Sequence, residues 1–247
     1  MIPLVEEIYK SGVVLDAEGK QHQLKANVDR EEGEFLFDLI ASDTSIAKTL
    51  EIGFAYGLSA LHITAATAGR AGAHHVTIDP FQKTQWHGIG IANLLRAGVT
   101  NYELIEELSE FALPQLAKAN PGGFDFVFID GWHTFDHTLI DLFYANRLLR
   151  VGGYVVIDDC GVVGVAKAVS YVANYPCYSL YAQSKGNTGT TKRRLAQKLF
   201  NSLPASLRST ALPKKVYDGL HRSRYSSMVA LKKVAEDERN WIWYRDF

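Results

Sequence analysis

Three aspartates and a histidine stand at the points where two apolar runs of this sequence end. Asp130 closes the run FDFVFI at residues 124–129, and Asp158 and Asp159 close the run YVVI at residues 154–157. If these runs are parallel strands of one sheet, a right-handed crossover brings the three carboxylates to the same edge. Carboxylates confined together raise one another's pKa unless a cation is present. All-oxygen ligation favours Mg²⁺, so we expect Asp130, Asp158 and Asp159 to bind Mg²⁺ or another divalent cation.

The histidine of this group, His133, follows Asp130 by three residues. An imidazole has an ordinary pKa of about 6.5 and can accept the proton of a hydroxyl group. His133 and Asp130 are therefore the candidate catalytic residues, although His133 is almost as well suited to orient Asp130 or to cap the next helix. Trp86 and Trp132 are equally suited to line an acceptor pocket and to pack in the core.

A second group of residues, EIGFAYGLS at positions 51–59, lies earlier in the chain between an apolar run and an apolar helix. Gly53 and Gly57 allow close approach of the backbone to a ligand, and Ser59 with the helix amides can receive a carboxylate. Asp79 ends the following strand, where a carboxylate is suited to accept the hydroxyl protons of a ribose. The order and spacing predict a cofactor that carries a nucleoside.

This loop differs from the dinucleotide-binding fingerprint. That motif requires glycine where this sequence has Ala55 and Leu58. A nicotinamide-dependent dehydrogenase is therefore a distant alternative.

Positioning these groups requires strands that alternate with helices. The chain predicts a single α/β domain, residues 1–247, with a doubly wound, mostly parallel, seven-stranded Rossmann-like sheet and an antiparallel last strand. Residues 1–45 form a helical cap segment, although only a turn at 17–20 and a helix at 31–41 are visible there. The predicted strands span residues 49–52, 75–78, 102–105, 124–129, 154–157, 178–182 and 227–233. The helices between them span residues 59–68, 90–97, 110–119, 134–149 and 165–174, and the aromatic tail from residue 237 should pack.

Composition limits the class of protein. At 247 residues with 47% hydrophobic and 21% charged residues, the chain suits one globular domain. It has two cysteines, Cys160 and Cys177, which indicates a reducing compartment. No secretory signal or membrane-spanning apolar run is visible, so we expect a cytoplasmic protein.

Residues 183–225 form a basic insertion between the last two predicted strands. They contain five lysines, five arginines and one aspartate, whereas the net charge of the whole chain is −1. Three interpretations are open: a lid that recruits an anionic acceptor, a peripheral membrane contact through residues 190–222, and a solvated face or homodimer contact. The membrane contact is the less favoured of these. No nucleic acid partner is expected, because no recognition motif is evident.

On these motifs the chain resembles the class I S-adenosylmethionine-dependent methyltransferases. It is most similar to the metal-dependent O-methyltransferases typified by catechol O-methyltransferase and by the macrolide-sugar and aminocoumarin-sugar enzymes. The resemblance spans residues 31–176. It rests on the acid, glycines and serine of residues 51–59, on IDP at 78–80, on FIDGWH at 128–133 and on the glycine pair at 152–153.

The resemblance implies S-adenosyl-L-methionine as the cofactor, bound by the loop at residues 51–59 and by the ends of the following strands. Glu51, Gly53 and Ser59 would bind its methionine end, and Asp79 its ribose. Leu108 stands where the family often has an acid that contacts adenine, which leaves Glu107 and Ser109 as candidates for that contact. The full candidate set for the cofactor is Glu51, Gly53, Ala55, Tyr56, Gly57, Ser59, Asp79, Pro80, Glu107, Ser109 and Asp130.

The predicted function is divalent-metal-dependent O-methyl transfer to a hydroxylated small molecule, with sugars and anionic compounds among the candidate acceptors. Two alternatives remain: a metal-independent methyltransferase with His133 as base, and a non-catalytic protein that binds S-adenosylmethionine.

Overall fold

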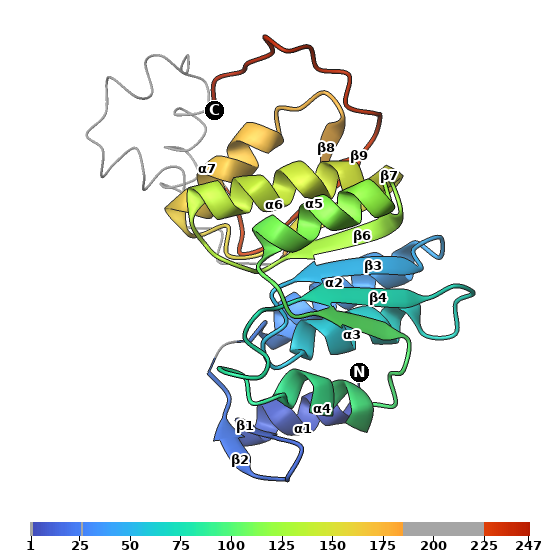
Figure 1. Ribbon diagram of the computed structural model, residues 1–247, viewed down its shortest axis with the longest axis vertical. Coiled ribbons are helices and arrows are strands. Elements are labelled where there is room, and N and C mark those ends of the chain that lie inside the picture. Colours follow the sequence, from blue (N-terminus) through green and yellow to red (C-terminus); the bar gives the residue numbers. More distant parts are fainter. Residues whose placement is uncertain (1, 26, 185–224) are drawn as a thin grey trace.

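The structure, a computed structural model, describes residues 2–25, 27–184 and 225–247. A seven-stranded sheet with the order β5-β4-β3-β6-β7-β9-β8 forms its centre (Figure 1). Neighbouring strands from β5 to β7 are parallel, whereas β9 is antiparallel to both β7 and β8. This is the predicted doubly wound, Rossmann-like sheet with an antiparallel last strand. The strands are β3 (Lys48–Ile52), β4 (His74–Ile78), β5 (Tyr102–Ile105), β6 (Phe124–Ile129), β7 (Leu149–Ile157), β8 (Tyr178–Gln183) and β9 (Val229–Lys233).

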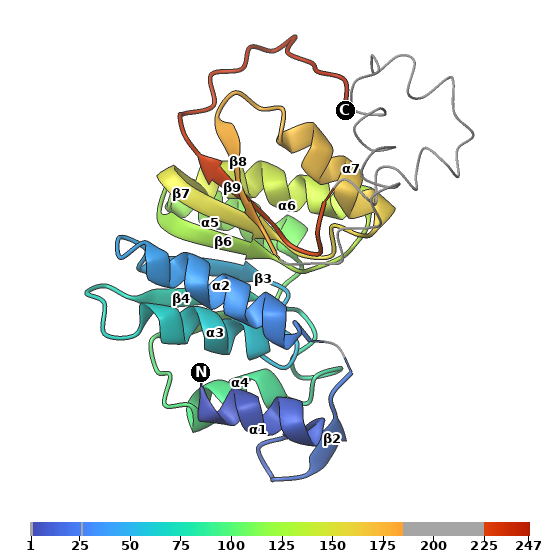
Figure 2. The same ribbon diagram turned by 180° about the vertical axis from the view of Figure 1, so that it is seen from behind.

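Helices cover both faces of this sheet. Helices α5, α6 and α7 lie over one face, in front in Figure 1, and α2 and α3 lie over the other, in front in Figure 2. Each face buries its own cluster of apolar side chains, and alternate residues of the central strands contribute to the two clusters. The helices are α1 (Pro3–Ser11), α2 (Arg30–Ser42), α3 (Leu58–Thr67), α4 (Ile89–Arg96), α5 (Ser109–Ala119), α6 (Phe135–Leu148) and α7 (Val163–Val172).

Two segments near the N-terminus form elements that the sequence pattern does not predict: helix α1 and a small hairpin of β1 (Val13–Leu15) and β2 (Gln21–Gln23). Each strand of the hairpin has only three residues, too few to show a period of two, and β2 is polar throughout. Tertiary contacts hold the hairpin, since the Arg96 guanidinium donates to the carbonyl oxygens of Leu15 and Asp16. Helix α2, which was predicted, begins with a capping box between Asp29 and Glu32.

Helix α6 buries one stripe of its side chains. Phe143 lies outside this stripe and is 39% exposed. The buried stripe instead contains Asp141, Leu142, Ala145 and Leu148, at helical spacing. The strand after α6 starts at Leu149, earlier than predicted.

The aromatic tail packs through Trp243 and Phe247, as predicted, and the Phe247 ring lies against the rings of Phe135 and Tyr171. Trp243 contacts the rings of Tyr171 and Tyr175, and the Arg239 guanidinium lies 3.2 Å from the centre of the Tyr175 ring. Trp241, by contrast, is 95% exposed.

The basic insertion lies almost entirely outside the described residues, and so does the membrane contact expected at residues 190–222. Its flanks are described: Ser184 and Met228 exchange two hydrogen bonds, of 3.1 and 3.0 Å. Among the helices that the structure does describe, none combines the length and the apolar character needed to cross a membrane.

Candidate active site

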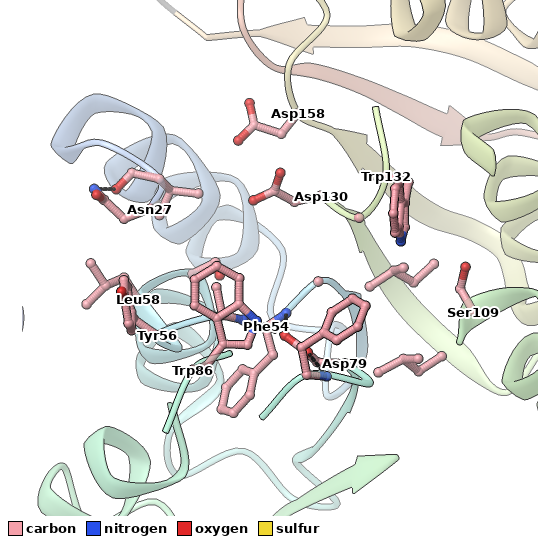
Figure 3. Close-up of a pocket in the computed structure, with 18 of the residues that line it drawn as sticks. Asn27, Phe54, Tyr56, Leu58, Asp79, Trp86, Ser109, Asp130, Trp132 and Asp158 are labelled. Atoms are coloured by element: carbon pink, nitrogen blue, oxygen red, sulfur yellow. Dashed lines mark hydrogen bonds between the residues drawn. The ribbon is translucent and has the colours of Figure 1, made fainter. Parts of the chain in front are cut away.

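A cavity of about 590 Å³ opens at the carboxyl ends of the central strands (Figure 3). This edge is where open α/β sheets bind ligands. The volume lies in the range of small-molecule and cofactor sites. The predicted residues that line the cavity are Gly53, Ala55, Tyr56, Ser59, Asp79, Pro80, Ser109, Asp130, His133, Asp158 and Asp159.

The loop after β3 forms one wall of this cavity. Gly53 has φ of +90°, and its Cα lies against the backbone of Asp130. Ala55 also adopts a left-handed φ, of +44°, at a position where the dinucleotide motif has glycine. The loop therefore makes the tight turn of a nucleotide-binding loop with only part of the usual glycine set.

Asp79 holds this loop in place. One oxygen of its buried carboxylate accepts hydrogen bonds from the backbone N–H groups of Phe54 and Ala55, at 3.1 and 2.8 Å. The other accepts from the N–H of Phe81 at 2.7 Å. Asp79 thus shapes the loop and also faces the cavity where the ribose contact was predicted.

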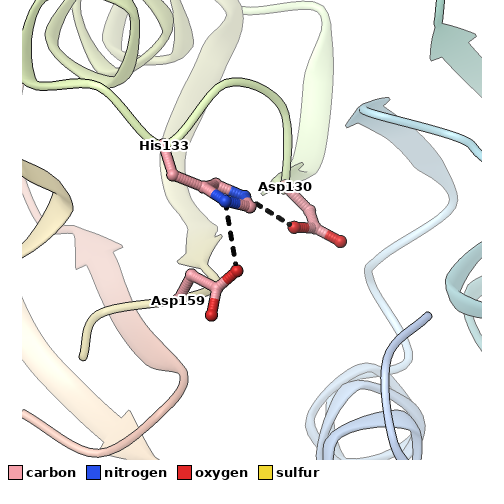
Figure 4. A group of neighbouring side chains, drawn as sticks. All are labelled: Asp130, His133 and Asp159. Carbon is pink, nitrogen blue, oxygen red and sulfur yellow. Dashed lines mark hydrogen bonds and ion pairs between the residues drawn. The ribbon is translucent and has the colours of Figure 1, made fainter. Parts of the chain in front are cut away.

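An acid–imidazole cluster of Asp130, His133 and Asp159 also lines the cavity, and Figure 4 shows its side chains. His133 lies between two carboxylates: Nε2 is 3.4 Å from Asp130 Oδ1, and Nδ1 is 3.3 Å from Asp159 Oδ2. Among the described residues, these three side chains offer ligand atoms that all lie within 4.8 Å of one another. The donor set, two carboxylates and one imidazole, fits a hard or borderline divalent cation such as Mg²⁺ or Mn²⁺.

The composition of this cluster differs from the predicted set of three aspartates. Asp158 is buried and lines the cavity, but Asp158 Oδ1 accepts the backbone N–H of Asp159 at 2.6 Å and faces the Ser227 hydroxyl at 3.5 Å. Asp159 has φ of +52°, and this left-handed turn directs its side chain toward His133 instead. Two consecutive aspartates therefore point in different directions, and His133 takes the third place in the cluster.

Burial and mutual repulsion change the proton affinities of these groups. Burial, then the nearby Asp130 carboxylate, raises the pKa of Asp158 far above its usual range. Burial also raises the pKa of Asp130, against the hydrogen bond with His133. The hydrogen bond with Asp130 raises the pKa of His133. Excess negative charge at this edge is thus unfavourable unless a cation or a proton compensates it.

Three residues of the candidate cofactor set do not line the cavity. The Glu51 carboxylate is fully buried, with Oε2 3.3 Å from both His75 Nε2 and Thr77 Oγ1. This side chain therefore does not itself line the cavity, and its contact with the methionine end of the cofactor stays a prediction. Gly57 is the N-cap residue of α3, and a Glu107 oxygen accepts the N–H of Leu108. Neither Gly57 nor Glu107 lines the cavity.

Several lining residues were absent from the sequence-based candidate set. Lys25, Asn27 and Glu32 come from the segment around the start of α2 and face the cavity across from β4 and β5. Glu32 accepts the Ser227 hydroxyl at 2.6 Å, which connects the first part of the chain to the last strand. Only the capping box that contains Glu32 was readable from the sequence, and it indicates a helix start rather than a site.

The comparisons with known proteins agree with this geometry. Residues 50–160 match the family described as "Methyltransferase domain". No curated protein matches the chain.

Solved structures share the fold at low sequence identity. An O-methyltransferase from Bacillus cereus in complex with SAH has 20% identity and a TM-score of 0.63, over 93% of this chain and 90% of that chain. A putative O-methyltransferase from Klebsiella pneumoniae has 18% identity and a TM-score of 0.62, over 94% and 90%. TomG from Streptomyces achromogenes, an O-methyltransferase involved in tomaymycin synthesis and solved with SAM, has 19% identity and a TM-score of 0.60, over 85% and 82%.

The matched domain covers the cofactor loop, Asp79, Asp130 and the Asp158–Asp159 pair. Residues 50–160 are thus similar to a methyltransferase domain, and the chain shares its fold with solved O-methyltransferases.

Proposed function

We propose that the protein is an S-adenosylmethionine-dependent O-methyltransferase that acts on a hydroxylated small molecule with the help of a divalent cation. The observation that carries the proposal is that one cavity contains both the nucleoside-type loop, with Gly53 and Asp79, and the cluster of Asp130, His133 and Asp159. Two of the similar O-methyltransferases were solved with SAH or SAM bound, which supports the same assignment.

In the proposed reaction the acceptor oxygen attacks the methyl carbon of the sulfonium. A C–O bond forms, the C–S bond breaks with its electron pair left on sulfur, and the hydroxyl proton leaves to a base. A divalent cation, when bound, supplies positive charge that lowers the pKa of the acceptor hydroxyl. Asp130 and Asp159 would hold the cation, while Gly53 and Ser59 would bind the methionine end of the cofactor. Holding the two reactants in line lowers the activation free energy by on the order of 7–11 kcal/mol in well-aligned cases.

Two roles are open to His133 in this scheme, and each excludes the other. As the third ligand it would complete the cation site, whereas as the base it would accept the hydroxyl proton, and one lone pair cannot do both. The base role belongs to a second candidate function, metal-independent methyl transfer. That candidate is favoured by the placement of His133 between two carboxylates, which stabilise the imidazolium that would form.

The acceptor side of the cavity presents the Trp86 ring, packed edge-on against Tyr56 at 5.2 Å, together with Asn27 and Glu32. An aromatic face beside polar groups suits a compact polyhydroxylated molecule, such as a sugar or a phenol.

The direct test is a screen of hydroxylated metabolites and sugars, read by release of S-adenosylhomocysteine with and without added Mg²⁺ or Mn²⁺. We expect turnover that a chelator abolishes and that Asp130→Asn and Asp159→Asn reduce at least about 100-fold. Full activity in the presence of the chelator, together with a large loss in His133→Gln, would instead support the metal-independent reaction. Absence of S-adenosylmethionine binding in calorimetry would refute both.

A further inference from the structure

The Glu32 carboxylate lines the cavity without a positively charged partner. Glu32 belongs to the first turn of α2 and is partly buried at the cavity wall. In residues 2–25, 27–184 and 225–247, no lysine, arginine or histidine forms an ion pair with it, and the guanidinium of Arg30 pairs with Glu6. A carboxylate that faces a confined space is costly without a counter-charge. Glu32 is therefore suited to receive a cationic group from a ligand.

Two hydrogen bonds fix the orientation of this carboxylate. Oε2 accepts the backbone N–H of Asp29 at 2.8 Å, as one half of the capping box. Oε1 accepts the Ser227 hydroxyl at 2.6 Å. An ionised carboxylate has about four lone-pair sites, so these two bonds leave acceptor capacity for a ligand. Glu32 thus combines a fixed position with unused acceptor sites.

Glu32 also lies close to the residues that would carry the reaction. The Ser227 hydroxyl that donates to Glu32 is 3.5 Å from Asp158 Oδ1. One hydroxyl oxygen therefore separates Glu32 from Asp158, which is the neighbour of Asp159 in the cluster. A group bound at Glu32 would lie only a few bonds from an acceptor hydroxyl bound at the cluster.

The part of the cavity around Glu32 has a second feature that suits a cation. In Figure 3, Asn27, which precedes α2, and Trp86 lie on one side of Asp130, and Trp132 lies on the other. Trp86 lines the cavity, as Glu32 does. An ammonium group is recognised by ion pairing with a carboxylate and by contact with the face of an aromatic ring. Both kinds of group are present in the cavity.

We propose that Glu32 determines the acceptor by binding a protonated amino group, so that the acceptor is a hydroxylated amine. The proposal rests on the proposed function, because it takes the cavity to hold S-adenosylmethionine and a hydroxyl that accepts the methyl group. The ion pair would also decide which atom is methylated. An ammonium nitrogen that keeps its proton has no lone pair to attack the methyl carbon, so the methyl group goes to oxygen. A carboxylate on the acceptor would be repelled by Glu32.

Calorimetry on the full chain, with S-adenosylhomocysteine and Mg²⁺ present, tests this proposal with two matched series of probes. The first series is glucosamine, glucose and glucuronate, and the second is tyramine, 4-ethylphenol and 4-hydroxyphenylacetate. The members of each series differ mainly in charge, which is positive, neutral and negative in turn. In at least one series the wild type should bind the ammonium member at least about tenfold more tightly than the neutral one, which corresponds to about 1.4 kcal/mol. The carboxylate member should bind most weakly.

Glu32→Gln removes the charge but keeps an oxygen for the capping box, so folding should be preserved. The preference for the ammonium member should fall below about threefold, while the affinity for S-adenosylhomocysteine alone stays within about twofold of the wild type. Glu31→Gln is the matched control, because it removes an exposed carboxylate from the same turn of α2. It should keep the wild-type preference.

Absence of a preference for the ammonium member in both series overturns the role of Glu32, and this comparison needs no variant. A preference that Glu32→Gln leaves unchanged overturns it as well. A large loss of S-adenosylhomocysteine affinity in Glu32→Gln has the same effect, because the carboxylate would then bind the amino group of the cofactor. Failure of the wild type to bind S-adenosylhomocysteine at all counts instead against the proposed function, so the two failures are distinguishable.

Discussion

Gly53 lies against the main chain of Asp130, so closely that a Cβ on Gly53 would stand 2.0 Å from the Asp130 carbonyl oxygen. The neighbouring backbone is hydrogen-bonded as well, since the N–H of Asp130 donates to the carbonyl of Ile52 at 2.8 Å. The loop that would bind the methionine end of the cofactor and the residue that would bind the cation are therefore in direct backbone contact. Their separation is fixed by the sheet rather than by flexible side chains.

Gly53→Ala should accordingly reduce both stability and cofactor binding. The new methyl group overlaps backbone, which cannot move easily, and φ of +90° is strained for alanine. We expect a loss of more than about 3 kcal/mol in the free energy of unfolding, measured with urea. Gly69→Ala is the matched control, because Gly69 has φ of +75° but open space around its Cβ position, and should cost only about 1 kcal/mol. Equal losses in the two variants would contradict the packing argument.

The two consecutive aspartates should differ in their effect on cation binding. Asp159→Asn removes a ligand of the cluster and should weaken Mn²⁺ binding by at least about tenfold in calorimetry. Asparagine tolerates the left-handed backbone of residue 159, so folding should be preserved. Asp158→Asn should have the smaller effect, because Asp158 Oδ1 is directed to the Asp159 N–H. A larger effect from Asp158→Asn would restore the predicted set of three aspartates.

His62 should make stability depend on pH. Burial lowers the pKa of His62 to about 4, whereas the unfolded value is about 6.5. Between these values the unfolded chain takes up a proton that the folded protein excludes, so this contribution to stability falls as pH falls. The loss between pH 7 and pH 5 is about 2 kcal/mol.

The test compares the free energies of unfolding of the wild type and His62→Gln at both pH values. The difference between the two proteins isolates His62 from the carboxyl groups that titrate in the same range. An identical pH dependence would show that the pKa of His62 is the same in the folded and the unfolded protein.

Of the two tryptophans in the C-terminal tail, Trp243 should contribute to the free energy of unfolding and Trp241 should not. Trp243→Ala removes contacts with Tyr171, Tyr175 and Arg239 and should lower the free energy of unfolding by about 2 kcal/mol. Trp241→Ala, in a side chain that is 95% exposed, should change it by less than about 0.5 kcal/mol. Similar effects from both variants would mean that the tail docks differently.

The sheet was predictable because each strand carries its own local signal. Buried parallel strands such as β6 are continuous apolar runs, and the loops after them contain the glycines and acids that a site at the carboxyl edge requires. The hairpin of β1 and β2 carries no such signal, since contacts with Arg96, more than 70 residues later, hold it.

The candidate site was predictable in position but only partly in detail. The spacing in the sequence places Asp130, Asp158 and Asp159 at one edge of the sheet. The left-handed backbone of Asp159 decides which of the last two side chains faces His133. No residue pattern in the sequence predicts this backbone conformation.

The hydrogen bonds between Ser184 and Met228 bear on how far the length of the chain between β8 and β9 can vary. Strands β8 and β9 pair antiparallel, and these hydrogen bonds join them at the ends where the chain leaves and re-enters the sheet. The register of the sheet is therefore independent of the length of that stretch, and doubling a flexible loop costs only about 0.6 kcal/mol in closure entropy. The segment 185–224 is thus inserted in the sequence between two paired strands, so that β3, β6 and β7, whose ends carry the candidate site, keep their pairing whatever its length.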